Sequence, residues 1–441
     1  MLPNLCSQDL AFDETDSMTS TRGLSQRALK AGGQPISALM HQALANPGLI
    51  SLAAGFVDPA TLPVELAGAA VDDVLADPVE ARRALQYGTN AGLPELREAL
   101  LERFLAADKT TAAETGLNLN HIVMTAGSNE LLHLLGDTLF DPGDIVLCGA
   151  PEYFVFLGLL SNLSVRAIGV TVDADGLVPA ALEKQLEQLD AAGELERVKA
   201  IYITSYYSNP STATLSIERR PQIVELAQRY SRRHPIYVID DAAYRDLRYE
   251  GQETPSLRAF DPTGETVIVA QTFSKCFSPG IRVGYGILPE GLVEPVLNQK
   301  GNIDFGAPNF GQHLIWKVLE RGVLDGHIAR LRTSYRSKLQ AMLGAADEHL
   351  AGIDGVSWSK PTGGLYVWLT LPEHLAAGPT GPLLKASVAA GVLYVPGEYC
   401  FPSEGVPVRR NTIRLSFGVQ TEEGIRRGIA ALGQAIREVA K

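Results

Sequence analysis

Between residues 64 and 300, short runs of apolar, β-branched residues alternate with helix-like segments. Seven of these runs have the length and composition of buried strands; they are 121–127, 144–150, 164–170, 199–205, 236–242, 266–272 and 283–288. Helical periodicity marks the segments between them, such as 179–192 and 219–233. This alternation predicts an α/β fold with a mostly parallel sheet covered by helices on both faces. Ligands of such sheets bind at the carboxyl ends of the strands, where we therefore look for functional residues.

The chain is too long for one ordinary hydrophobic core, because cores stop growing at about 250–300 residues and this chain has 441. After about residue 310 the pattern changes to long helices, followed by the strand-like runs 363–371, 391–397 and 412–418. We predict four segments: a flexible, polar tail (1–20), an N-terminal segment contributing to a small domain (21–58, with a helix around 35–46), a large domain that binds the ligand (59–310) and a small C-terminal α/β domain (311–441).

Charge and apolar patterning limit the possible partners. The chain has 38 basic and 50 acidic residues, a net charge of −12, and lacks the basic patch that nucleic acid or an anionic membrane would require. No stretch reaches the ~20 apolar residues of a membrane span. The first residues lack the basic start and apolar segment of a signal peptide. We therefore expect no nucleic-acid partner and no membrane partner.

The cysteines and histidines do not form a metal-binding or disulfide pattern. Four cysteines stand far apart and form no CxxC pair; they are Cys6, Cys148, Cys276 and Cys400. Such cysteines are typical of reduced thiols in the cytoplasm. Eight histidines are scattered without the spacing of metal ligands. We expect a cytoplasmic protein without a metal site.

The segment QTFSKCFSPGIRVGYG contains the strongest functional signal. Lys275 follows an apolar run, and Arg282 comes seven positions later. A lysine that forms a Schiff base needs an unprotonated amine, and burial beside another cation can lower its pKa. The hydroxyls of Thr272 and Ser274 with the Arg282 guanidinium would form a clamp for a dianion. A solvated lysine and arginine on a loop is the alternative, but the order of the motifs favours function.

In this order of motifs, the chain from about residue 24 to its end resembles the fold-type I pyridoxal-phosphate enzymes. Within them it resembles the aminotransferase branch that includes aminoadipate and kynurenine aminotransferases. The resemblance implies pyridoxal 5′-phosphate as the cofactor, with Lys275 carrying it as a Schiff base and acting in catalysis. It also implies a homodimer with shared active sites, in which Tyr87 reaches the cofactor phosphate of the neighbouring subunit.

The resemblance assigns cofactor-binding roles to the ends of two predicted strands. Gly127, Ser128 and Asn129 lie between a strand and a helix, where backbone N–H groups form an anion site. In the family this loop holds the cofactor phosphate, whereas an ordinary helix cap is the alternative. Tyr153 follows the next strand, at the position from which the family stacks an aromatic ring on the pyridine. A tyrosine of the core is the alternative there.

The motif YVIDDAAYRDL supplies the second strong signal. In the family an aspartate beside the pyridine nitrogen keeps it protonated, and a tyrosine hydroxyl reaches the 3′ oxygen. We assign these catalytic and cofactor-binding roles to Asp241 and Tyr244. Asp241 rather than Asp240 matches the family, because the tyrosine lies three residues after it. Adjacent acids that merely cap a helix are the alternative.

The resemblance implies that three further residues bind the substrate. Arg414, within an apolar run, matches the family's bidentate clamp for the substrate carboxylate, although a surface-strand arginine is the alternative. Asn209 matches the asparagine that binds the 3′ oxygen and helps to hold the carboxylate, but Ser211 and Thr212 replace the usual Thr-Gly after Asn-Pro. Gly55 would let the chain pass close to the substrate.

These residues predict an aminotransferase that moves an amino group from an α-amino acid to a 2-oxo acid such as 2-oxoglutarate or pyruvate. A lyase or decarboxylase on the same fold is the alternative, and a non-enzymatic regulator would leave Arg414 unexplained. Relatives that act on acidic side chains carry an arginine where QPISALM has Ser37. We therefore expect a neutral or aromatic donor, with Arg22 or Arg27 as residues that could compensate.

Overall fold

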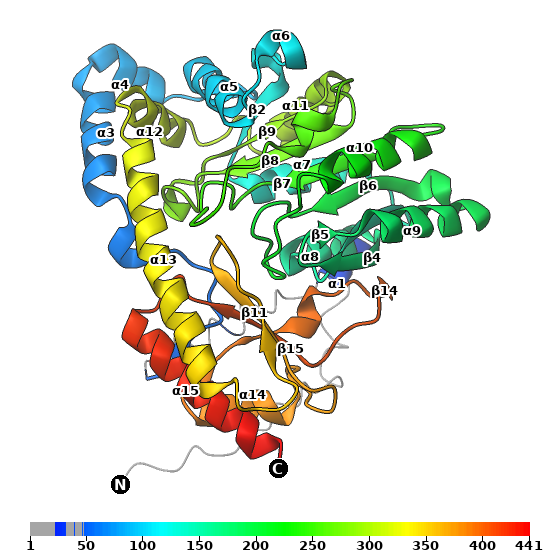
Figure 1. Ribbon diagram of the computed structural model, residues 1–441. Helices are drawn as coiled ribbons and strands as arrows, with labels where there is room; N and C mark the ends of the chain where they lie inside the picture. Colours follow the sequence, from blue (N-terminus) through cyan, green and yellow to red (C-terminus); the bar gives the residue numbers. More distant parts are fainter. Residues whose placement is uncertain (1–22, 32–38, 40–45, 47) are drawn as a thin grey trace.

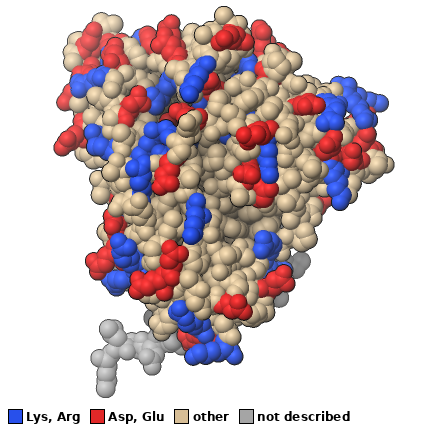
Figure 2. All heavy atoms as spheres, in the orientation of Figure 1, with Lys and Arg blue, Asp and Glu red and all other residues tan. Residues whose placement is uncertain are grey.

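The computed structural model describes residues 23–31, 39, 46 and 48–441. The predicted tail, 1–20, lies outside the described residues, as does most of the helix predicted around 35–46. In the described parts of the chain, no helix has the length and apolar character needed to cross a bilayer. Figure 2 shows acidic and basic side chains interspersed over one face of the molecule, which gives this face no single-signed patch.

A nine-stranded sheet forms the centre of the larger part of the molecule (Figure 1). Its order is β14-β4-β3-β6-β7-β8-β9-β2, with β5 paired to β4. The strands are β2 (Ile122–Thr125), β3 (Ile145–Ala150), β4 (Arg166–Asp173), β5 (Gly176–Leu177), β6 (Val198–Ile203), β7 (Tyr237–Asp241), β8 (Val267–Thr272), β9 (Gly284–Ile287) and β14 (Glu404–Gly405). All neighbours from β14 to β8 are parallel, and β9 is antiparallel to both β8 and β2. Each predicted run contains one strand, and the mostly parallel sheet is confirmed.

Helices cover both faces of this sheet because successive side chains of a strand point to opposite faces. Along β3, Ile145 and Leu147 join the core that includes side chains of one group of helices, namely α5 (Pro94–Asp108), α9 (Pro179–Ala191) and α10 (Arg219–Tyr230). Val146 and Cys148 join the core on the other face, with α7 (Ser128–Leu139), α8 (Phe154–Leu163) and α11 (Glu290–Ile303). Burial on both faces explains why the strands read as continuous apolar runs.

A second, four-stranded antiparallel sheet lies in the C-terminal part, in the order β10-β11-β15-β13. Its strands are β10 (Ser357–Trp358), β11 (Tyr366–Thr370), β13 (Val395–Pro396) and β15 (Thr412–Ser416). The helices of this part are α13 (Leu324–His349), α14 (Pro382–Ala389) and α15 (Glu422–Val439). The short strand β1 (Ile50–Ser51) pairs in parallel with β12 (Val392–Leu393), so residues 50–51 join this part. The predicted boundaries at residues 58 and 310 stay a prediction.

The remaining elements are short or lie at the edge of the large sheet. The helices are α1 (Gln26–Lys30), α3 (Val64–Ala76), α4 (Pro78–Ala84), α6 (Ala112–Thr115) and α12 (Asn309–Glu320). Single 3-10 turns are η2 (Pro59–Thr61), η3 (Leu119–His121), η4 (Leu195–Arg197), η5 (Leu257–Phe260), η6 (Pro279–Ile281) and η7 (Gly397–Cys400). Helix α13 runs from the large sheet to the small one (Figure 1). Residues that follow strands of the large sheet and residues of the small sheet together line the candidate site.

Candidate active site

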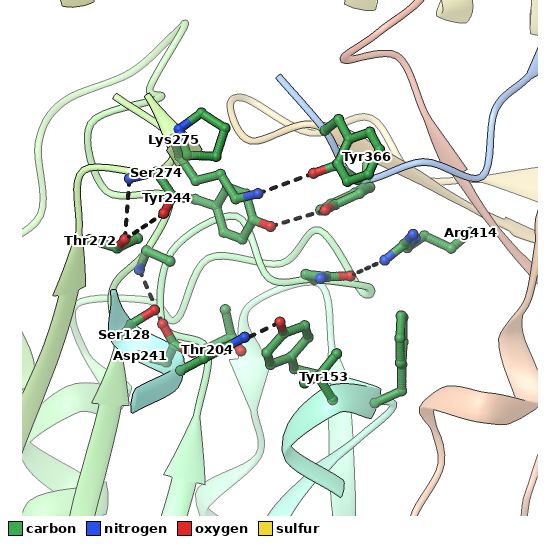
Figure 3. Close-up of a pocket in the computed structure, with 18 of the residues that line it drawn as sticks. Ser128, Tyr153, Thr204, Asp241, Tyr244, Thr272, Ser274, Lys275, Tyr366 and Arg414 are labelled. Carbon is green, nitrogen blue, oxygen red and sulfur yellow. Dashed lines mark hydrogen bonds between the residues drawn. The ribbon is translucent and has the colours of Figure 1, made fainter. Parts of the chain in front are cut away.

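A cavity of about 260 Å³ lies where the carboxyl ends of β6, β7 and β8 face the small sheet (Figure 3). It brings together most of the residues that the sequence singles out. Those that line it are Gly55, Ser128, Asn129, Tyr153, Asn209, Asp241, Tyr244, Thr272, Ser274, Lys275, Arg282 and Arg414. They come from the ends of β7 and β8, from loops after strands, from the start of α7 and from β15, as expected for a site at the carboxyl edge of a parallel sheet.

Lys275 lies in the loop between β8 and β9 and points into the cavity (Figure 3). Its Nζ donates to the Gly55 carbonyl at 3.1 Å and lies 5.8 Å from the ring centroid of Tyr244. The loop is held by a bond from the Phe273 N–H to the Val283 carbonyl at 3.0 Å. The amine is thus presented to the cavity at a defined place and has no carboxylate partner among the described residues.

One end of the cavity is built for an anion. Arg282 donates to the Ala126 carbonyl at 2.8 Å and to Ser274 Oγ at 3.4 Å, and Thr272 Oγ1 donates to Ser274 Oγ at 2.9 Å. Gly127 begins α7 with a φ of 87°, and a Cβ there would lie 2.5 Å from Arg282 Nη2. The glycine therefore lets the guanidinium pass over the helix N-terminus, where unpaired N–H groups favour a phosphate.

Asp241 ends β7 inside the cavity, whereas Asp240 points to the opposite face. Asp241 is 4% exposed and accepts from Tyr202 Oη at 2.7 Å and from the Ala243 N–H at 3.3 Å. Burial raises the pKa of Asp241 to about 6. Asp240 accepts from Ser205 Oγ and from the Leu257 N–H, which ties it into the core. Burial disfavours the ionised form of Asp241, and a cationic ligand atom beside it would stabilise that form.

Arg414 forms the other end of the cavity. It lies in β15, is 1% exposed, and donates to Asn209 Oδ1 at 2.9 Å and to the Ala53 carbonyl at 2.7 Å. The ring centroids of Tyr366 and Phe154 lie 4.5 and 5.4 Å from its guanidinium carbon. Its Nε has no hydrogen-bond partner, and no carboxylate pairs with it among the described residues. A buried charge without a counter-ion is costly, so this guanidinium is suited to an anionic ligand.

Among the residues that were not identified from the sequence are Tyr366 and Thr204, which line the cavity, and Tyr202, which contacts Asp241 without lining it. The other lining residues that were not identified are Phe56, Phe154, Val155, Ala243 and Pro279. Tyr366 lies beside Arg414, Tyr202 donates to Asp241, and Thr204 Oγ1 donates to Glu152 Oε1 at 2.7 Å. Tyr202 and Thr204 lie two residues apart, in β6 and just after it, so they share one face of the chain. A tyrosine within an otherwise aliphatic strand was the one available signal for Tyr202.

Three predicted residues do not line the cavity: Gly127, Tyr87 and Arg27. Gly127 lies next to the Arg282 guanidinium, just before α7. Tyr87 is 76% exposed, and its ring contacts Phe305 edge-on with centroids 5.6 Å apart. Arg27, on α1, pairs with Asp137 at 2.6 Å. Ser37 and Arg22, on which the substrate prediction depends, lie outside the described residues. Tyr153 lines the cavity beside Asn129, with the phenol 3.5 Å from Asn129 Oδ1.

An amine, a buried acid, an anion cradle and a buried guanidinium therefore share one cavity. The family model of class I and II aminotransferases matches residues 48–432. The chain belongs to this family. It is a pyridoxal-phosphate-dependent aminotransferase of fold-type I, in the branch of the aminoadipate and kynurenine enzymes. No comparison favours a lyase or a decarboxylase.

Relatives of this aminotransferase match it over nearly their whole length. Aromatic-amino-acid aminotransferase 1 of Thermococcus litoralis is 34% identical, over 97% of each chain. The structure of Pyrococcus horikoshii kynurenine aminotransferase, in complex with PMP, has a TM-score of 0.86 and 32% identity and covers 95% of this chain and 98% of that one. The α-aminoadipate aminotransferase of Thermus thermophilus, complexed with N-(5′-phosphopyridoxyl)-L-leucine, has a TM-score of 0.81 and 28% identity, over 95% and 98% of the two chains.

The cavity of this aminotransferase fits its cofactor. Lys275 could supply the amine, Asp241 a carboxylate for the pyridine nitrogen, and Arg282 with Ser274 the donors for a phosphate. Two structural observations support the fit. A Cβ at Gly127 would crowd the Arg282 guanidinium, and among the described residues the buried Nε of Arg414 has no hydrogen-bond partner, which leaves a donor for a ligand.

Proposed function

We propose that this aminotransferase moves the amino group of a neutral or aromatic α-amino acid to a 2-oxo acid such as 2-oxoglutarate or pyruvate. The observation that carries the proposal is the buried Arg414 guanidinium, which has no carboxylate partner among the described residues and lies in the same cavity as the Lys275 amine. The first group suits a substrate carboxylate, and the second suits proton transfer at the neighbouring carbon.

Residues at three strand ends would hold the cofactor. Arg282, Ser274 and Thr272, with the N-terminus of α7, would bind the phosphate. Asp241 would keep the pyridine nitrogen protonated. The remaining contacts would come from the Tyr153 ring on the pyridine face and from Tyr244 and Asn209 at the 3′ oxygen. When bound, pyridoxal phosphate supplies an electron-withdrawing ring that makes the substrate Cα proton acidic.

The chain's own residues would then orient the substrate and move the proton. Arg414 would bind the α-carboxylate through its fork of donors, and the Asn209 amide already lies 2.9 Å from it. This contact would fix which bond of the Cα is presented for cleavage. The Lys275 amine would take the proton from the Cα. Because Arg414 would retain the carboxylate, the geometry opposes the decarboxylation that was the alternative.

The cavity lining supports a neutral or aromatic side chain. Its apolar wall consists of Phe56, Phe154, Val155, Pro279 and Tyr366. Among the described residues, the cations that line it are Lys275, Arg282 and Arg414, and each is assigned to the cofactor or to the α-carboxylate. A second carboxylate on the substrate would therefore find no remaining cation there. The Thermococcus litoralis relative, named for aromatic amino acids, agrees with this preference.

A donor screen tests the proposal. Leucine, methionine, phenylalanine, glutamate and aminoadipate would each be offered with 2-oxoglutarate or with pyruvate, and kcat/KM would be measured for every pair. We expect the neutral and aromatic donors to be preferred at least about tenfold. The Lys275→Ala variant should lose the visible band of the bound cofactor and at least about a thousandfold of kcat. A preference for glutamate or aminoadipate would overturn the substrate assignment, and an intact band in Lys275→Ala would overturn the site assignment.

The proposal also includes a cytoplasmic homodimer with shared active sites. Tyr87, Leu85 and Phe305 are large apolar side chains left exposed on one chain, and such a group is typical of an interface. Tyr87 would reach the cofactor phosphate of the partner subunit. Cys148, Cys276 and Cys400 are free and buried, which suits a reducing compartment.

A further inference from the structure

Tyr366, a residue that the proposed mechanism does not use, touches two of the residues that it does. It is the first residue of β11 and is buried. Its hydroxyl lies 3.0 Å from the hydroxyl of Tyr244, and the two rings meet edge-on with centroids 5.8 Å apart. Figure 3 shows both phenols pointing toward each other across the cavity, next to the Lys275 side chain. The hydrogen bond joins the segment after β7 of the large sheet to β11 of the small one, 122 positions apart.

The ring of Tyr366 also forms one wall of the Arg414 site. The guanidinium carbon lies 4.5 Å from the ring centroid, a distance at which a cation is attracted by an aromatic face. The pairing of β11 with β15 creates this contact. Arg414 is directly opposite Trp368 in the register, so Tyr366 is its diagonal neighbour, and diagonal neighbours are within reach of an aromatic side chain.

The hydroxyl of Tyr366 fits against the backbone at residue 55 because this residue is a glycine. A Cβ at Gly55 would lie 2.6 Å from the Tyr366 oxygen. The carbonyl of Gly55 accepts the hydrogen bond from Lys275 Nζ. The hydroxyl of Tyr366 is therefore held between the Gly55 backbone and the Tyr244 phenol, with little freedom to move.

We propose that Tyr366 is a positioning residue that acts on both the cofactor and the substrate: its hydroxyl orients the Tyr244 phenol, and its ring supports the Arg414 guanidinium. This inference rests on the roles proposed above for Tyr244 and Arg414. The role of the hydroxyl and the role of the ring can be tested separately, because substitutions can remove the hydroxyl alone or the hydroxyl together with the ring.

The hydroxyl contact makes Tyr244 a better donor. Burial raises the pKa of the Tyr244 phenol well above its usual range, so this phenol stays protonated. Either hydroxyl can be the donor in this bond, but Tyr244 has a single hydroxyl hydrogen, so a Tyr244 that donates to the cofactor must accept from Tyr366. A hydroxyl that receives a hydrogen bond is polarised and donates more strongly in turn. Tyr366 would thus strengthen the bond from Tyr244 to the cofactor 3′ oxygen. The other groups that face this phenol are Lys275, Tyr153 and Arg414, and none of them changes in the variants below.

The test compares the holoenzymes of the wild type, Tyr366→Phe, Tyr366→Leu and Tyr394→Phe. Tyr394 is the matched control, because its buried hydroxyl donates to the Ala377 carbonyl at 3.2 Å, outside the cavity. The first measurement is the pH titration of the visible absorption band of the bound cofactor. In Tyr366→Phe we expect the midpoint to rise by about half a pH unit to one unit, because a less stabilised 3′ oxygen favours the protonated chromophore. In Tyr394→Phe it should stay unchanged.

The second measurement separates kcat from KM for one preferred donor. Tyr366→Phe keeps the ring on Arg414, so kcat should fall several-fold while KM stays within about twofold. Tyr366→Leu loses the ring as well, and KM should rise about fivefold or more.

A Tyr366→Phe enzyme whose titration and kcat match the wild type would overturn the inference. So would a Tyr394→Phe enzyme that shifts as much as Tyr366→Phe. Failure of the proposed function looks different, because the wild type would then lack a titrating band that Lys275→Ala abolishes.

Discussion

At the scale of single residues, burial rather than the neighbouring sequence determines whether the carboxyl group of Glu152 is ionised. Glu152 is 3% exposed, and its Oε1 accepts from Thr204 Oγ1 at 2.7 Å and from the Tyr153 N–H at 3.0 Å. Burial is the largest cause that raises the pKa of Glu152 to about 8, and the nearby charge of Asp241 adds to it. Two carboxyl groups therefore lie buried close to the cofactor site, and mutual repulsion disfavours having both ionised.

Glu152→Gln should make stability less dependent on pH. In the folded protein Glu152 holds its proton up to a pH of about 8, whereas the unfolded chain releases it near the ordinary value of 4.5. The unfolded state is thus favoured as the pH rises through this window, and the wild type loses stability there. Glutamine keeps the Oε1 acceptor and has no proton to lose. We expect the Tm of Glu152→Gln relative to the wild type to rise by about 2 °C or more between pH 5 and pH 8.

The control for this prediction is Glu98→Gln, which changes a glutamate exposed on α5. Its Tm relative to the wild type should be the same at both values of pH. If the Tm of Glu152→Gln and the Tm of the wild type change equally between pH 5 and pH 8, Glu152 is not buried in its protonated form.

At the scale of elements, the junction of β2 with α7 and the loop between β8 and β9 form one unit. Gly127 and Gly284 face each other so closely that a Cβ on Gly284 would lie 2.7 Å from the Gly127 backbone. Arg282 itself has a φ of 51° and directs its guanidinium over Gly127. Two glycines and one left-handed arginine therefore allow a helix N-terminus and a cation to approach the same anion.

Gly127→Ala should weaken cofactor binding about tenfold or more and lower the free energy of unfolding by about 1–3 kcal/mol. The new Cβ would meet Arg282 Nη2 at 2.5 Å, and the φ of 87° is strained for alanine. The measurements are the dissociation constant of pyridoxal phosphate and urea unfolding of the cofactor-free protein. Gly116→Ala is the control: Gly116 also has a positive φ, 69°, but nothing lies within 4 Å of its Cβ position. Equal losses of cofactor affinity in the two variants would contradict the predicted contact with Arg282.

At the scale of the whole molecule, the proposed dimer would complete the site. Tyr87 lies far outside the cavity of its own chain and is exposed together with Phe305. If its role is to bind the partner's cofactor phosphate, a chain lacking Lys275 and a chain lacking Tyr87 have complementary defects. A mixed dimer then contains one site with both residues intact.

Mixing Lys275→Ala with Tyr87→Ala should therefore restore function. Tyr87→Ala alone should bind pyridoxal phosphate about tenfold more weakly, because it loses a hydrogen bond to a charged group. After unfolding and refolding together, about half of the dimers are mixed, and each should regain one site with wild-type affinity and turnover. Sedimentation should give twice the mass of one chain. If the activity of the mixture equals the sum of the activities of the two variants measured separately, shared sites are excluded.

Many features of this aminotransferase could be predicted from local sequence. Seven of the nine strands of the large sheet were predictable, because residues buried on both faces form continuous apolar runs that need no partner to be recognised. The two-residue strands β5 and β14 are too short to give such a run. The positions of Lys275, Asp241 and Arg282 at the cavity followed from the same pattern, since loops after parallel strands meet at one edge. The choice of Asp241 over Asp240 came from the family resemblance, because Tyr244 lies three residues after Asp241, and Asp241 is the one of the two that lines the cavity.

Tertiary structure alone decided the contacts between the two sheets. The sequence contains no signal that pairs Tyr366 with Tyr244, because these partners lie 122 positions apart and belong to different layers. Only the family resemblance linked Arg414 with Asn209, which lie 205 positions apart. Such contacts depend on the angle and distance at which the small sheet packs on the large one, and local periodicity carries no information about either. The buried state of Glu152 has the same origin, since Thr204 reaches it from a strand that is adjacent only in the folded sheet.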